Sequence, residues 1–295
     1  MSSFLIRTIT GLFLVLIVVG SIMFSSLTYC FLFLLIIIVG LNEFYSMARM
    51  AKIRPQKFSG ILIGGLIFII NFLYAMEFIN ENFFFIFVPL ILIIFINELY
   101  LKNNRPFSNI AYTFLGLIYV AVPVSLWNYI VMHTGDIAEG NIISGAVFDP
   151  INQVLQPSIK IQYSPGILMG FFIITWLSDT GAYLVGVPFG RRKLFKRISP
   201  KKTWEGFLGG AIIALMASYP VSLLFHDLPL IHWLVVAIIV IVMGTFGDLV
   251  ESLYKRSLGV KDSGHILPGH GGVLDRFDTI LLSSPVVFTY LQLLQ

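Results

Sequence analysis

The residues best suited to chemistry form a polar block at positions 252–278, SLYKRSLGVKDSGHILPGHGGVLDRFD, in an otherwise apolar chain. Charged side chains of both signs alternate along it: Lys255, Arg256, Lys261, Asp262, Asp275, Arg276 and Asp278. Interleaved glycines, Gly271 and Gly272 among them, allow close approach of the backbone to a ligand or a positive φ. Cations that neutralise phosphate and carboxylates that hold a divalent ion together predict a nucleotide-phosphate site. A flexible loop with paired charges would explain the glycines, but not HGG followed by DRFD at a helix start.

The metal chemistry of this block should rest on oxygen ligands. The only cysteine, Cys30, lies in an apolar run, which excludes an intramolecular disulfide and a cysteine-rich metal site. His265 and His270 suggest zinc as an alternative, but the surrounding carboxylates favour hard oxygen ligation of magnesium. His270 could also bond a phosphate or orient a ligand, and its role stays open.

Two carboxylates lie inside apolar segments upstream of the block. Thr175, Ser178, Asp179 and Ala182 follow helical spacing and share one face, which Tyr183 and Gly186 extend. Asp248 lies on a second such segment, in a series that ends at Ser252 and Lys255. An ionisable group about 12 Å inside a spanning helix is costly and marks a functional site by default, although a structural bond between helices is the alternative. We expect both carboxylates to face one cleft.

A basic stretch, RRKLFKRISPKKTWEG at residues 191–206, lies between these two segments. Its first half is typical of a topology determinant or a contact with anionic lipid. The second half resembles a helix start, with Thr203 or a neighbour as the cap and Glu205 in the first turn. A helix N-terminus flanked by Lys201 and Lys202 is suited to bind phosphate.

The elements that position these residues are predicted to be membrane helices. Of the 295 residues, 57% are hydrophobic and 12% are charged, and the mean hydropathy of +0.91 is typical of a membrane protein. Apolar runs predict nine helices, starting near Phe4, Thr28, Ser59, Phe83, Ile110, Gly166, Phe207, Leu230 and Thr279. A cleaved signal peptide is the alternative for the first run, which is longer than signal peptides usually are.

Charges in the connections predict the orientation of these helices. Taken alternately, one set of connections holds every Lys and Arg except Lys160, and the other set is acidic. The positive-inside rule then places the N-terminus in the cytosol and the C-terminus outside. We expect an all-α polytopic membrane protein of one domain, residues 1–295, in which residues 1–132 are mainly scaffold helices. Residues 166–295 carry the site, and residues 133–165 form an external loop or short hairpin.

The block at residues 252–278 resembles the signature of the phosphatidate cytidylyltransferases, also called CDP-diacylglycerol synthases. The matching positions are Ser252, Lys255, Arg256, Lys261, Asp262, Gly264, Pro268, His270, Gly271, Gly272, Asp275, Arg276 and Asp278. Tyr254 departs from the pattern, in which an aliphatic residue or Phe is usual. SDTGAYLVG from Ser178 and SPKKTWEG from Ser199 are similar to other segments of that family. The specific resemblance covers about the last 130 residues.

The resemblance implies that CTP and phosphatidic acid react to give CDP-diacylglycerol and pyrophosphate. It implies magnesium held by Asp248 and Asp275, and a second, monovalent cation such as K⁺ is left open. We expect the substrate-binding residues to be Ser178, Asp179, Lys201, Lys202, Thr203, Glu205, Ser252, Gly271 and Gly272. The expected catalytic residues are Asp248, Lys255, Arg256, Lys261, Asp262, His270, Asp275, Arg276 and Asp278. We expect CTP, phosphatidic acid and membrane lipids as partners in a bacterial plasma membrane, without nucleic acid, and leave a homodimer open.

Three other functions compete with this interpretation. A CTP-dependent lipid-alcohol kinase would use a similar phosphate site but release CDP instead of pyrophosphate. A CDP-alcohol phosphotransferase expects several aspartates at helical spacing on one segment, which Asp275 and Asp278 alone do not supply. A secondary transporter also places carboxylates in helices, but it usually shows paired repeats and needs no phosphate-type loop.

Overall fold

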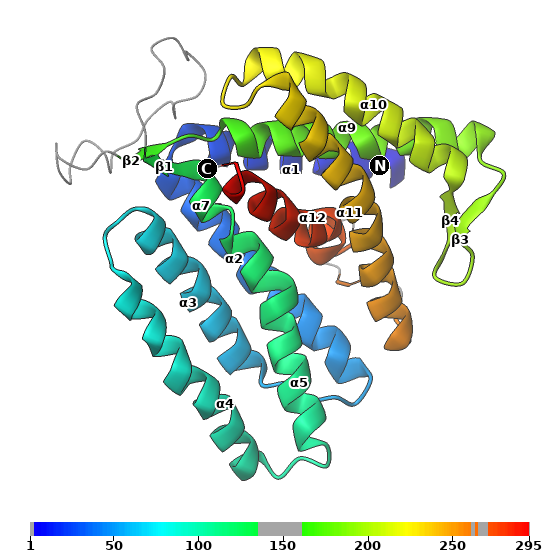
Figure 1. The fold of residues 1–295 in the computed structure, drawn as a ribbon. Coiled ribbons are helices and arrows are strands. Elements are labelled where there is room, and N and C mark those ends of the chain that lie inside the picture. Colours follow the sequence, from blue (N-terminus) through cyan, green and yellow to red (C-terminus); the bar gives the residue numbers. More distant parts are fainter. Residues whose placement is uncertain (1–2, 135–160, 261–262, 265–270, 295) are drawn as a thin grey trace. The chain divides into compact units, whose positions relative to one another are not determined.

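The chain is almost entirely helical in the computed structural model, which describes residues 3–134, 161–260, 263–264 and 271–294 (Figure 1). In order, the elements of the first half are α1 (Ser3–Phe24), α2 (Ser26–Met50), α3 (Lys57–Ala75), η1 (Glu81–Ile86), α4 (Phe87–Leu101), α5 (Pro106–Gly116), η2 (Leu117–Ala121), α6 (Val122–Ser125) and α7 (Asn128–Val131). The second half contains β1 (Met132–Thr134), β2 (Ile161–Tyr163), α9 (Gly166–Phe189), β3 (Lys193–Phe195), β4 (Ser199–Thr203), α10 (Trp204–Leu224), α11 (Leu230–Ser257) and α12 (Leu274–Gln292).

A helix begins within five residues of each of the nine predicted starts, except that the fourth begins as the short helix η1. Seven spans in the described part of the chain are long and apolar enough to cross a membrane: Ser26–Met50, Lys57–Ala75, Glu81–Leu101, Pro106–Val131, Gly166–Phe189, Trp204–Leu224 and Leu230–Ser257. The helix α1 contributes a shorter apolar stretch, Ile9–Phe24, and α12 carries three charged residues near its start. The chain is therefore a multi-pass membrane protein, while nine spans and the orientation stay predictions.

The described residues group into two compact units. The first unit consists of Met1–Ser21, Leu27–Tyr129 and Lys255–Phe277, and the second consists of Ile22–Ser26, Ile130–Tyr254 and Asp278–Gln295. The helices α11 and α12 each pass from one unit into the other. The polar block is thereby divided, with Ser252 and Asp278 in the second unit and the residues between Lys255 and Phe277 in the first. The expectation of a single domain stays a prediction.

The first unit is a bundle in which α3 contacts α4, α5 and α6 (Figure 1). Tyr45 is fully buried and donates a hydrogen bond to the carbonyl of Thr113 at 2.8 Å, which ties α2 to α5. A buried polar cluster joins the other helices, because Glu98 accepts bonds from Gln56 and Asn109 at 3.0 and 2.7 Å. Buried polar groups in an apolar bundle are stable only when they are bonded in this way.

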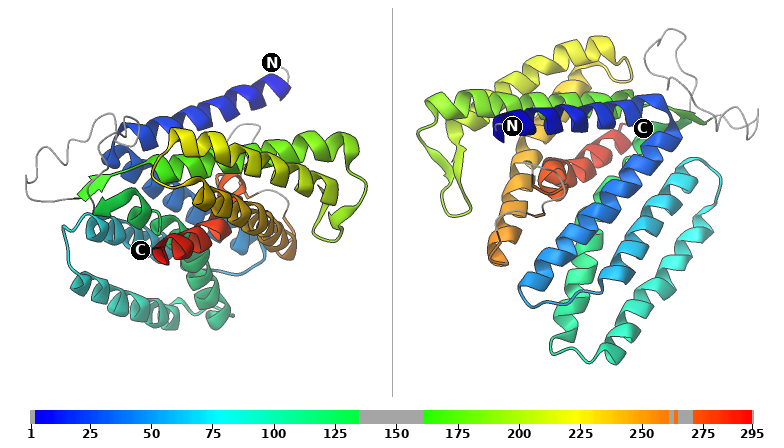
Figure 2. Two further views of the ribbon diagram at one scale, coloured as in Figure 1. Left: turned by 45° about the horizontal axis from the view of Figure 1, so that its top comes forward. Right: turned by 180° about the vertical axis from the view of Figure 1, so that it is seen from behind.

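The second unit is built on the antiparallel neighbours α9 and α10, which lie side by side in both views of Figure 2. Small residues allow this contact, because a Cβ on Gly210 would lie 2.7 Å from the carbonyl oxygen of Ser178. Two short antiparallel ribbons complete the unit. In the first, β1 pairs with β2 at the two ends of the segment that was predicted to be a loop or short hairpin, and residues 135–160 lie outside the described part.

The second ribbon, β3 with β4, connects α9 to α10 and was not predicted from the sequence. Lys193 pairs with Thr203 and Phe195 with Ser199, with an irregularity between them. The basic stretch therefore folds as a hairpin that extends beyond the ends of both helices (Figures 1 and 2). The strands are short, and charged residues at successive positions hide the alternation by which a strand is recognised in a sequence.

Candidate active site

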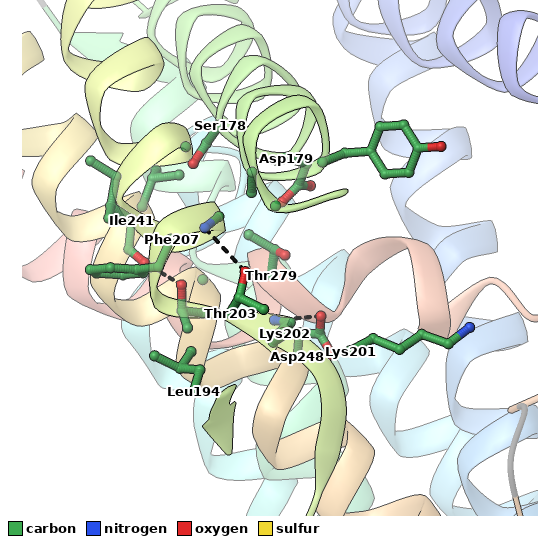
Figure 3. A pocket seen from close by; sticks show the side chains of 18 of the residues that line it. Ser178, Asp179, Leu194, Lys201, Lys202, Thr203, Phe207, Ile241, Asp248 and Thr279 are labelled. Atoms are coloured by element: carbon green, nitrogen blue, oxygen red, sulfur yellow. Dashed lines mark hydrogen bonds and ion pairs between the residues drawn. The ribbon is translucent and has the colours of Figure 1, made fainter. Parts of the chain in front are cut away.

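A cavity of about 650 Å³ lies inside the second unit, between α9, α10, α11 and the β3–β4 hairpin (Figure 3). Polar residues line one part of it: Thr175, Ser178, Asp179, Lys193, Lys201, Lys202, Thr203, Thr245, Asp248 and Thr279. Apolar side chains, among them Val187, Phe207 and Ile241, line the remainder. A cavity of a few hundred cubic ångströms with convergent polar groups is typical of a small-molecule site.

The helix α9 contributes the predicted polar face. Thr175, Ser178, Asp179 and Ala182 all line the cavity, as their helical spacing predicts. The hydroxyl of Thr175 donates to the carbonyl of Phe171 at 2.8 Å, so this side chain offers the cavity only an acceptor. Asp179 is exposed, which leaves its carboxylate accessible to a ligand.

An ion pair joins α11 to the hairpin at the polar side of the cavity. The Nζ of Lys202 lies 2.5 Å from Oδ2 of Asp248, and both side chains remain about one-third exposed, at 28% and 33% (Figure 3). The other carboxylate oxygen of Asp248 accepts a bond from the hydroxyl of Ser252, one helical turn later, at 3.2 Å. The predicted series on α11 therefore converges on Asp248, with a lysine from the hairpin as its counterion.

A third carboxylate, that of Asp278, interacts electrostatically with Asp179, Asp248 and Lys202. Asp278 lies at the start of α12, outside the seven candidate spans. The backbone N–H of the next residue, Thr279, donates to the Asp278 carboxylate at 2.7 Å. Burial is the largest cause that raises the pKa of the Asp278 carboxyl, and the nearby Asp248 and Asp179 carboxylates act in the same direction. The bond from Thr279 and the charge of Lys202 lower it, and the net pKa is about 7. Two carboxylates and one lysine therefore act together on Asp278 in this part of the second unit.

The start of α10 is capped as predicted. The hydroxyl of Thr203 accepts the N–H of Gly206 at 3.2 Å, and the N–H of Trp204 bonds the carbonyl of Arg192 at 2.9 Å. Because these N–H groups are already bonded, an anion near this helix start would depend on the ammonium groups of Lys201 and Lys202. Both lysines line the cavity, so the structure brings them to the predicted phosphate position.

Glu205 occupies a different place from the other predicted substrate-binding residues. Its carboxylate accepts the backbone N–H of Arg191 at 3.0 Å and that of Arg192 at 3.1 Å. These bonds attach the start of the hairpin to the first turn of α10. The side chain of Glu205 therefore holds the hairpin that presents the lysines, and it does not line the cavity.

The first unit holds an ion pair within the polar block. The Nζ of Lys255 lies 2.6 Å from Oδ1 of Asp275, and the two side chains are only 13% and 10% exposed. The other oxygen of Asp275 accepts the N–H groups of Ser263 and Gly272, at 3.2 and 3.0 Å. Gly271 adopts a φ of +83°, which disfavours any side chain, so the predicted positive φ is confirmed there.

The remaining predicted residues are placed only in part. Arg256 and Arg276 are exposed in the first unit. Lys261, Asp262 and His270 lie outside the described residues, as do His265 and Pro268. Among the described residues, no three His, Cys, Asp or Glu side chains are grouped closely enough to hold a metal ion by themselves.

Comparison with known proteins shows the family of the chain. The model of the cytidylyltransferase family matches residues 5–294, nearly the whole chain. The chain belongs to the cytidylyltransferase family. It is similar to a phosphatidate cytidylyltransferase of Bacillus subtilis (strain 168), with 31% identity over 300 residues and 97% of each chain covered. Phosphatidate cytidylyltransferases of Staphylococcus haemolyticus and Staphylococcus aureus (strain COL) are 52% and 50% identical over 118 and 119 residues, or 39% of this chain and 45% of theirs.

One buried carboxyl group that contacts the polar block was not predicted from the sequence. Glu43 of α2 is 3% exposed and accepts the backbone N–H groups of Val273 and Leu274 at the start of α12. A carboxyl group in an apolar helix is the same signal that identified Asp179 and Asp248. Applied to the first half of the chain, that rule would have found Glu43.

Proposed function

We propose that this chain is a phosphatidate cytidylyltransferase, a nucleotidyltransferase that joins CTP and phosphatidic acid to give CDP-diacylglycerol and pyrophosphate. The family membership and the B. subtilis relative, aligned over 97% of both chains, support the activity. The observation that carries the assignment to a site is the Lys202–Asp248 pair within a cavity of about 650 Å³.

In the proposed reaction, a phosphate oxygen of phosphatidic acid attacks the α-phosphorus of CTP. A new O–P bond forms, the bond between the α-phosphorus and the bridging oxygen breaks, and pyrophosphate leaves. The attacking phosphate is largely ionised near neutral pH, since its second pKa is about 6, so no strong general base is required. The chain must instead screen two anionic reactants, align them and stabilise the charge on the leaving group.

The residues of the second unit suit that task. Lys193, Lys201 and Lys202 line the polar side of the cavity and can neutralise phosphate oxygens. Apolar residues such as Val187 and Phe207 line the rest, which suits contact with a lipid. Asp179 would orient a cation or a substrate group from α9. Within the first unit, Lys255, Arg256 and Arg276 would neutralise further phosphate charge.

Magnesium is commonly held by one or two carboxylates together with water and substrate phosphates, so Asp179, Asp248 and Asp278 of the second unit offer oxygen donors that suit it. Burial, and then the nearby Asp248 and Asp179 carboxylates, raise the pKa of Asp278, and a bound cation would lower it again. Asp248 and Asp275 stay the predicted ligands, and a monovalent cation stays a further prediction. When bound, magnesium would neutralise the phosphates and stabilise the departing charge. Displacement of Lys202 from Asp248 would free both the carboxylate for the ion and the ammonium for a phosphate.

The location of the reaction is part of the same proposal. Nine spans with a cytosolic N-terminus would place the basic hairpin and the polar block at the cytosolic face, where CTP is present. Phosphatidic acid presents its phosphate at the membrane interface, so the lipid need not be extracted. The bacterial relatives favour the plasma membrane as the location.

A pyrophosphate assay on the purified chain in detergent or liposomes tests the function. We expect release of pyrophosphate from CTP that requires both phosphatidic acid and magnesium. dCTP, ATP and a lipid alcohol serve as competing substrates. CDP as the product, with a lipid alcohol as the better acceptor, would establish the lipid kinase instead, and no turnover with any acceptor would favour a carrier.

A further inference from the structure

Glu43 is a buried carboxyl group in a membrane helix of the scaffold half of the chain. It lies in α2 with 3% of its surface exposed. Burial of such a group is costly unless it is fully bonded. Its hydrogen bonds therefore identify what the carboxyl group does.

Among the described residues, three hydrogen bonds reach the Glu43 carboxylate, and all three come from the polar block. The backbone N–H of Val273 donates to Oε1 at 3.0 Å, and that of Leu274 donates to Oε2 at 2.9 Å. These N–H groups lie at the start of α12, where a helix has no partners of its own and where its dipole favours negative charge. The hydroxyl of Ser263 donates to Oε2 at 3.3 Å. Glu43 thus caps α12 and also holds the segment around Ser263.

Two glycines of the block are required by this contact. A Cβ on Gly264 would lie 2.5 Å from Oε1 of Glu43, and one on Gly272 would lie 2.5 Å from Oε2. Real Cβ atoms essentially never approach a neighbour so closely. The Glu43 side chain is therefore the close neighbour at Gly264, whereas at Gly272 the hydroxyl of Ser263 lies closer still than Glu43.

Asp275 also binds the two segments that Glu43 contacts, one at Ser263 and one at the start of α12. It accepts the N–H groups of Ser263 and Gly272, while its other oxygen pairs with Lys255. Glu43 and Asp275 consequently both fix the first turn of α12 and Ser263, and the position of the Lys255–Asp275 pair depends on that turn of α12.

We infer that Glu43 is a positioning residue for cytidylyl transfer, which it serves by holding the first turn of α12, where Asp275 pairs with Lys255 of α11. Glu43 itself contacts backbone and Ser263, so its effect on the reaction passes through Asp275. The inference rests on the proposed function for its kinetic consequence, whereas the contact with the turn can be tested without any activity.

Backbone amide exchange followed by mass spectrometry tests the contact on the full chain in detergent. In Glu43→Ala, peptides that cover residues 272–277 should exchange roughly tenfold faster, the effect of losing one hydrogen bond of ordinary strength. Peptides from α3 should exchange at the wild-type rate. Glu98→Gln is the matched control, because Glu98 is also a buried carboxyl of the first unit but bonds Gln56, Asn103 and Asn109. This control should leave residues 272–277 protected.

Pyrophosphate release then tests the consequence for the reaction. Glu43→Gln keeps the shape of the side chain and one acceptor oxygen. It should therefore fold even if Glu43→Ala fails to fold. We expect its kcat to fall roughly tenfold, equivalent to one lost bond at the transition state, with the KM for CTP unchanged. Ser263→Ala removes the weakest of the three bonds and should have a smaller effect in the same direction.

The outcomes separate the inference from the proposed function. Unchanged exchange at residues 272–277 in both Glu43 variants would overturn the contact itself. Faster exchange with a wild-type kcat would overturn the positioning role. If the wild-type chain released no pyrophosphate, the proposed function would fail, while the exchange experiment would still decide the role of Glu43 in the turn.

Discussion

The two lysine–aspartate pairs in the described part of the molecule have the same chemistry but different surroundings. Lys202 and Asp248 pair across a cavity of the second unit with about one-third of each side chain exposed. Lys255 and Asp275 pair in the first unit, where each is at most 13% exposed and Asp275 also bonds two backbone N–H groups. The first pair can open to admit a ligand at small cost, whereas the second pair is part of the structure of a turn.

The largest effect is expected from Asp275→Asn. The substitution leaves the buried ammonium of Lys255 without its counterion, so we expect the free energy of unfolding to fall by about 3 kcal/mol. Thermal unfolding in detergent measures this loss, and pyrophosphate release should fall below detection. The double variant Lys255→Gln with Asp275→Asn removes the stranded charge and should recover part of the stability but no activity. An Asp275→Asn protein of wild-type stability would contradict the structural role of the buried pair.

Asp248→Asn should separate activity from stability. Because the Lys202–Asp248 pair is partly exposed, its loss should change the free energy of unfolding by less than about 1 kcal/mol. Pyrophosphate release should nevertheless fall roughly 100-fold or more, the usual effect of removing one electrostatic group from a reaction site. Thermal unfolding and turnover are measured on the same preparation. A loss of stability equal to that of Asp275→Asn would remove the distinction between the two pairs.

Lys202→Met should weaken the binding of CTP. If the ammonium leaves Asp248 to neutralise a phosphate, its removal should raise the KM for CTP about tenfold, the value of one charge-assisted bond. Lys202→Arg keeps the charge and should stay closer to the wild type. An unchanged KM in Lys202→Met, with kcat alone reduced, would indicate that Lys202 serves only to hold Asp248.

The sequence predicted the elements and residues that depend on local pattern. Nine helices follow from apolar runs, the cavity face of α9 follows from the spacing of Thr175, Ser178 and Asp179, and the cap at Thr203 follows from residue type. Each of these depends on neighbours within about two helical turns, where composition and spacing determine the structure. The family also follows from short motifs, and the comparison with known proteins confirmed it.

The sequence did not predict which distant residues meet. Spacing placed Asp179 and Asp248 at one cleft and Lys202 at a helix start, but the pairing of Lys202 with Asp248 depends on the β3–β4 hairpin, which was not predicted. The bonds from Val273 and Leu274 to Glu43 join residues more than 200 positions apart, and no local pattern encodes such a contact. Only the cost of burying a carboxyl group could have indicated that Glu43 has partners, without naming them.

The smallest effect is expected from Thr203→Ala, which tests how the cavity pair is held. The loss of the cap at Gly206 should lower the free energy of unfolding by about 1 kcal/mol, while Thr203→Ser keeps the hydroxyl and should stay close to the wild type. Because Thr203 directly follows Lys202, the frayed helix start should also raise the KM for CTP, by less than Lys202→Met does. Thermal unfolding and CTP titration measure the two effects. Equal losses in the Ala and Ser variants would assign the effect to packing of the methyl group. A loss confined to Ala would mean that a local cap positions the cavity pair, in contrast to the distant carboxyl group of Glu43 that holds the turn of the buried pair.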